Sequence, residues 1–82
     1  MALARDAKVT AGQRARDESA RASLLRERAT LIEKSFGAGE TPLPEVLRAV
    51  AAAAQAEAAV SRAQAALAQA TSRLQQALGV MP

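Results

Sequence analysis

Apolar residues follow a strict seven-residue spacing in the second half of the chain. Two rows three residues apart carry this pattern, one with mostly large and one with only small side chains. This spacing places both rows on one face of a helix, and a strict repeat of seven is typical of a left-handed coiled coil. We therefore expect a helix over about residues 42–79. Its packing seam is formed by Val46, Ala53, Val60, Leu67, Leu74 and Met81 in one row and Ala49, Ala56, Ala63, Ala70 and Ala77 in the other.

The first part of the chain shows a weaker pattern of the same kind. Its large apolar residues recur at helical spacing, and alanines at 15, 22 and 29 extend the row in steps of seven. We expect a helix over about residues 5–36, regular from about Arg14 and frayed before it, because few large apolar residues precede that point. The buried face is expected to contain Leu24, Leu25, Leu31, Ile32 and Phe36.

Residues that end helices are concentrated between the two patterns. Gly37 and Gly39 supply the left-handed position that terminates a helix, and Thr41 followed by Pro42 is typical of an N-cap with proline at the first helical position. A turn over residues 37–41 is short enough to force the helices to pack antiparallel. The predicted fold class is all-α, a single coiled-coil-like antiparallel two-helix hairpin over residues 1–82.

Chain length and composition favour association. The chain has 82 residues with one phenylalanine and no tyrosine or tryptophan, so a conventional globular core is not expected. A two-helix chain of this size buries too little surface to be very stable as a monomer. We therefore expect self-association into a helical bundle.

The sequence lacks the residue types most often used for catalysis and metal binding. The chain contains no cysteine and no histidine, so its serines have no imidazole base and the common zinc ligands are absent. The stretch Gly37 to Gly39 follows a helix and lacks the Gly-Lys-Ser/Thr ending of a phosphate loop. We expect no enzyme activity, no catalytic residue, no metal and no cofactor.

Net charge and hydropathy add two further expectations. The formal charge is +3 and arises before residue 37, where acids alternate with the basic residues. This alternation favours a solvated helix face over a nucleic-acid surface built from Arg14, Arg16, Arg21, Arg26 and Arg28. No run of eighteen apolar residues and no signal-peptide core is present, so the chain is expected to be either cytosolic or a piece of a larger protein.

An ordered series of short motifs surrounds the turn and closes the second helix. Phe36 is followed by Gly39, Leu43 and the run Val-Leu-Arg-Ala at 46–49, and residues 74–79 read Leu-Gln-Gln-Ala-Leu-Gly. Over about residues 30–80 this order resembles the C-terminal periplasmic hairpin of TolC-like outer-membrane efflux proteins. The sequence of residues 35–49 is most similar to the branch that serves cobalt-zinc-cadmium efflux pumps, although Pro42 and Pro44 depart from the family pattern.

The resemblance implies a transport role. Such proteins form trimers whose hairpins line a periplasmic tunnel, and the turn of the hairpin docks the periplasmic adaptor (membrane fusion) protein. This chain then corresponds to one hairpin of the tunnel, and the isolated piece is expected to form a dimer of hairpins. Carried over by position, the docking tip comprises Phe36, Gly37, Ala38, Gly39, Glu40, Thr41, Leu43 and Val46. The simpler interpretation is that these residues only end and connect two helices.

A second function class fits the same pattern. A stand-alone cytoplasmic hairpin could act as an interaction protein that dimerises into a four-helix bundle through Val60, Leu67 and Leu74. The polar positions of the second helix are rich in glutamine and do not decide between the two function classes. They suit a wet channel wall, a helix interface or an ordinary exposed face.

Overall fold

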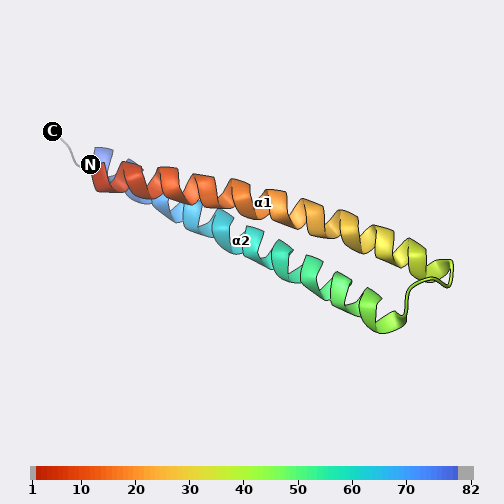
Figure 1. Ribbon diagram of the computed structural model, residues 1–82. Coiled ribbons are helices and arrows are strands. Elements are labelled where there is room, and N and C mark those ends of the chain that lie inside the picture. Colours follow the sequence, from red (N-terminus) through yellow and green to blue (C-terminus); the bar gives the residue numbers. More distant parts are fainter. Residues whose placement is uncertain (1, 80–82) are drawn as a thin grey trace.

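Two long helices make up the structure. The computed structural model describes residues 2–79 and contains α1 (Ala2–Gly37) and α2 (Leu43–Gly79). The helices run antiparallel, so the start of α1 and the end of α2 lie together and the turn lies at the opposite end (Figure 1). The described residues form no strand, and the expected all-α hairpin is confirmed. Met81 and Pro82 lie outside the described residues.

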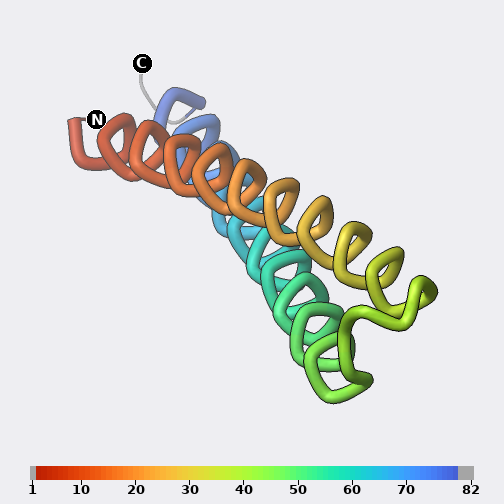
Figure 2. The backbone as a smooth tube through the Cα atoms, turned by 45° about the vertical axis from the view of Figure 1, so that its right-hand side comes forward, coloured from red at the N-terminus to blue at the C-terminus, as the bar shows by residue number. Residues whose placement is uncertain are grey.

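The hairpin is a thin rod. Its extents are 67 × 13 × 13 Å, and a second view shows the same two helices lying along each other (Figure 2). Its accessible surface is 5985 Å², whereas a globular monomer of this mass exposes about 4,700 Å². The hairpin therefore exposes about 1,300 Å² more surface than a compact chain of equal mass would.

The seam residues of α2 are covered by α1. All ten that the structure describes are buried or half-buried, and Ala56 is only 3% exposed. Most of the buried positions are alanine, and no large side chain among residues 2–79 is completely enclosed. Because alanine ends at Cβ, the two helix backbones can approach closely, and the apolar stabilisation is spread over many small contacts.

The buried face of α1 differs from the expected one. Leu24 and Leu31 are each 66% exposed, while Ala22 and Ala29 are buried. Adjacent residues point about 100° apart on a helix, so only one of Leu24 and Leu25 can face α2. Leu25 is the half-buried member of that pair, as is Ile32 in the next. Phe36 is also exposed, so the expectation that all five residues share the buried face is wrong.

The start of α1 also differs from the expectation. The helix begins at Ala2, three residues before the expected start at about residue 5, and it is regular through Arg14. Its contact with α2 here depends on small residues, since Ala4, Ala11 and Gly12 are the half-buried positions of this stretch. A Cβ placed on Gly12 would lie 3.9 Å from Leu67 Cδ1, which shows how closely the α2 leucine packs on α1.

The C-terminus of α1 forms a Schellman motif. The Gly39 N–H donates to the Phe36 carbonyl and the Glu40 N–H to the Ser35 carbonyl, both at 2.9 Å. Gly39 has a φ of 79°, in the left-handed region that side chains disfavour. Gly39 is therefore the terminating glycine, while Gly37 is still the last helical residue.

Pro42 caps α2. Its carbonyl accepts hydrogen bonds from the N–H groups of Glu45 (3.1 Å) and Val46 (3.4 Å), as the carbonyl of an N-cap residue does. The expected placement of Thr41 at the N-cap and Pro42 at the first helical position is wrong by one residue. The Thr41 hydroxyl instead lies 2.6 Å from the Ser35 hydroxyl, so it closes the turn against α1.

The two turn glycines should respond in opposite directions to alanine. Gly39→Ala should lower the free energy of unfolding by about 1–2 kcal/mol, because it forces a Cβ into the left-handed region. Gly37→Ala should raise it by about 0.5 kcal/mol, since a helical glycine loses more backbone entropy on folding. Urea denaturation followed by circular dichroism measures both, and equal effects at the two positions would contradict the assigned turn geometry.

Candidate functional site

The turn end of the hairpin brings together the residues expected to dock a partner. Phe36 and Gly37 end α1, residues 38–42 cross between the helices, and Leu43 begins α2. The structure thus places the whole predicted set at one end of the rod (Figure 1). A Cβ on Gly37 or Gly39 would meet no atom within 4 Å, so both glycines face open space. A partner backbone can therefore approach this surface closely.

Members of the predicted docking set differ in accessibility. Leu43 is 50% exposed and Phe36 is also exposed, so both present apolar surface. Val46 is only 8% exposed and belongs to the packed interface of the helices. Val46 is therefore placed to hold α2 against α1 and has little surface left for a partner.

Two residues outside the predicted set extend the apolar surface of the turn end. Leu47 (59% exposed) and Val50 follow Leu43 at spacings of four and three residues, which places all three on one face of α2. The signal was present in the sequence as a second apolar row beside the seam. The strict seven-residue pattern of the seam masked it.

The large seam residues of α2 already pack against α1 within the hairpin. Leu67 and Leu74 line one pocket with Val9 and Gly12 of α1, and Val60 lines another with residues of α1. Each of the three is half-buried, so α1 covers part of each side chain and the remainder opens to the side of the hairpin. A four-helix bundle formed through them would have to use that uncovered part.

The outer face of α2, opposite the seam, carries no charge over most of its length. The residues of this face recur at spacings of four and three, and every one of them is exposed. It consists of Leu47, Ala51, Ala54, Ala58, Ser61, Ala65, Ala68 and Ser72. Small uncharged residues at this spacing allow another helix to pack closely.

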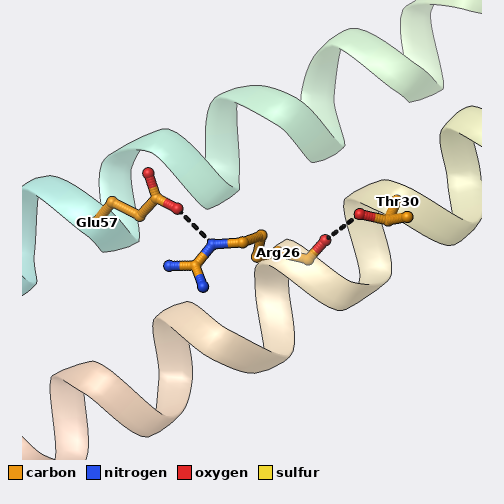
Figure 3. Close-up of polar contacts among 3 residues, drawn as sticks. All are labelled: Arg26, Thr30 and Glu57. Atoms are coloured by element: carbon orange, nitrogen blue, oxygen red, sulfur yellow. Dashed lines mark hydrogen bonds and ion pairs between the residues drawn. The ribbon is translucent and has the colours of Figure 1, made fainter.

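A single ion pair joins the helices within residues 2–79. Arg26 Nε donates to Glu57 Oε1 at 2.6 Å, and the Thr30 hydroxyl donates to the Arg26 carbonyl at 3.1 Å (Figure 3). Both charged side chains are about half exposed. Such pairs contribute roughly 0–1 kcal/mol, so the ion pair adds little to stability beyond the seam.

Glu18 is the charged residue at a seam position of α1. It lies seven residues before Leu25 and is half-buried. Its Oε2 atom is enclosed and has no hydrogen-bond partner among residues 2–79. Burial of an unpaired carboxylate oxygen opposes folding, so this position is a weak point of the seam.

Two other kinds of site were sought in the described residues. No group of three or more acidic side chains among residues 2–79 is placed to hold a metal ion. Neither helix, over the same residues, combines the length and the apolar character needed to cross a bilayer. The features on which a function can be based are therefore the turn end, the outer face of α2 and the sides of the hairpin.

Comparison with family models, characterised proteins and solved structures gives no match to this chain. The resemblance to TolC-like hairpins therefore stays a hypothesis based on the residues of the turn and of α2.

Replacing the seam carboxylate should stabilise the hairpin. Glu18→Leu continues the row that contains Leu25, and it should raise the free energy of unfolding by about 1 kcal/mol. A change of this size raises the melting temperature by about 4–8 °C in a chain of this length. Thermal denaturation followed by circular dichroism measures it. Glu27→Leu, at an exposed position, is the control and should change stability by less than about 0.5 kcal/mol.

Proposed function

We propose that this chain is a non-enzymatic assembly element, namely a periplasmic tunnel hairpin of an outer-membrane efflux channel. In this proposal the turn end docks a periplasmic adaptor protein of a tripartite pump, and the sides of the hairpin contact other helices of the trimeric channel. The observation that carries it is the apolar surface of Phe36, Leu43, Leu47 and Val50 at the same end as the two open glycines.

The physical properties of the turn end support docking. Exposed leucines beside a rigid backbone supply apolar contact area without a large ordering cost on binding. The Schellman motif and the Ser35–Thr41 hydroxyl contact fix the backbone between the helices. A partner would therefore meet a preformed surface.

The sides of the rod support lateral packing in a tunnel wall. The excess exposed surface of about 1,300 Å² exceeds the roughly 800 Å² that one partner buries in a standard protein interface. The uncharged outer face of α2 offers one place where a neighbouring helix can pack without burying unpaired charge.

Binding to adaptor proteins tests the proposal. The immobilised wild-type hairpin should bind a periplasmic adaptor of the same organism, and the double variant Leu43→Glu/Leu47→Glu should weaken binding at least tenfold because it places charge in the apolar contact. Biolayer interferometry gives the dissociation constants.

The control variant is Leu24→Glu, which changes an exposed leucine away from the turn and should leave adaptor affinity unchanged. Circular dichroism must show equal helicity for all three proteins. A folded wild-type hairpin that binds none of the organism's adaptors would overturn the docking proposal.

A stand-alone cytoplasmic hairpin that dimerises into a four-helix bundle is the second candidate. The outer face of α2 favours it, since a second copy could cover the row of small residues. Ala58→Glu/Ala65→Glu should then convert a dimer into a monomer in sedimentation equilibrium at micromolar concentration, because it buries unpaired charges. Leu43→Glu should leave the dimer intact. A wild-type chain that is a folded monomer at this concentration would reject the bundle.

A further inference from the structure

A groove runs along one side of the hairpin between α1 and α2. It contains two pockets, of about 320 and 290 Å³. Arg28 of α1 and Arg48 of α2 line the pocket nearer the turn, and Arg14 and Arg62 line the second. The two pockets are thus bordered by arginines from both helices. We call this surface the arginine groove.

The two pockets occupy equivalent positions on the same side of the hairpin, two heptads apart. Arg14, Arg21 and Arg28 are seven residues apart, so Arg21 lies on the same face of α1 between the two pockets. On α2, the alanines at 52, 59 and 66 also repeat every seven residues and line the pockets. The groove therefore has arginine along its α1 edge and a floor of small apolar side chains.

The positive charge of the groove is only partly offset within the hairpin. Four arginines and two glutamates, Glu18 and Glu45, line the two pockets. The ion pair that the structure shows within residues 2–79 joins Arg26 to Glu57 and involves none of these arginines. The groove thus combines an apolar floor with an excess of positive charge on both edges.

We propose that the arginine groove binds an acidic helix of a partner protein. The helix would place small apolar residues on the alanine floor and Asp or Glu residues along both of its edges, where they meet arginines of α1 and α2. A floor of alanines repeating every seven residues matches the contact row of a helix packed at close range. Guanidinium groups bind carboxylates with two parallel hydrogen bonds, which suits arginine on both edges. The groove is separate from the turn end, so this proposal does not depend on adaptor docking.

The observations favour an acidic helix over two other occupants. Single strands of nucleic acid bind through base stacking on aromatic side chains together with phosphate contacts, and the one aromatic residue of this chain is Phe36 at the turn. A second copy of this chain carries a net charge of +3, so it complements an arginine-lined surface poorly.

A designed peptide tests the charge requirement. The probe is a fluorescein-labelled helical peptide of four heptads with Ala and Leu at the a and d positions and Glu at e and g, and its matched control has Gln in place of Glu. The wild-type hairpin should bind the Glu peptide at least tenfold more tightly than the Gln peptide in fluorescence anisotropy. Arg21→Gln/Arg28→Gln/Arg62→Gln should abolish this preference. Arg5→Gln/Arg16→Gln should retain it, because Arg5 and Arg16 line a different pocket.

A pair of alanine variants tests the shape of the floor. Ala66→Leu fills the floor of the groove, whereas Ala65→Leu places the same side chain on the outer face of α2, and both positions are exposed. Ala66→Leu should weaken peptide binding at least fivefold and Ala65→Leu should not. Circular dichroism checks that both variants remain helical.

Several results would overturn the proposal. Equal binding of the Glu and Gln peptides would show that the groove does not select acidic residues. Equal effects of Ala65→Leu and Ala66→Leu would show that the floor is not the contact. A sixteen-base-pair DNA duplex that binds more tightly than the Glu peptide, and loses binding in the triple arginine variant, would identify the surface as a phosphate-binding one. Loss of a homodimer in that variant, seen by sedimentation velocity, would assign the groove to a second copy.

Discussion

The close approach of two helices through alanine is the constraint on which the hairpin depends. Ala22 and Ala29 of α1 and the alanine row of α2 leave little space between the backbones, so no large side chain among the described residues is fully enclosed. The leucines that a conventional core would bury are displaced to the edges of the seam or to the outer faces. This arrangement gives a thin rod whose own interior is small and whose partner-accessible surface is large.

The sequence was sufficient to predict α2 but only part of α1. The α2 pattern repeats every seven residues, and one periodicity therefore identifies the residues that face α1. In α1 the large residues occur as adjacent pairs, Leu24 with Leu25 and Leu31 with Ile32. Either member of a pair can satisfy helical spacing, and the choice is made by the partner helix. The cap of α2 was misassigned for a similar reason, because the Thr41 hydroxyl has a competing partner in Ser35.

The candidate surfaces were predictable to different degrees. The turn end follows from the positions of the glycines and prolines, although the burial of Val46 and the exposure of Leu47 required the packed structure. The arginine groove could not be predicted from the order of residues along the sequence. Basic and acidic residues alternate along α1, so the sequence suggests an ordinary solvated face. Only the pairing of the helices places Arg14 and Arg28 beside the arginines and alanines of α2.

The alanine row of α2 has a consequence for how the two helices find their alignment. Its members, Ala49 to Ala77 in steps of seven, are chemically identical partners for Leu25 and Ile32 of α1. Sliding α2 by one heptad would therefore restore nearly the same contacts along this row. The alignment is selected by other features, namely the length of the turn, the position of Leu67 beside Gly12 and the Arg26–Glu57 pair. In larger proteins a varied core selects one alignment of the packed elements. In this hairpin the five-residue connection between α1 and α2 does so, because it disfavours alignments shifted by one heptad.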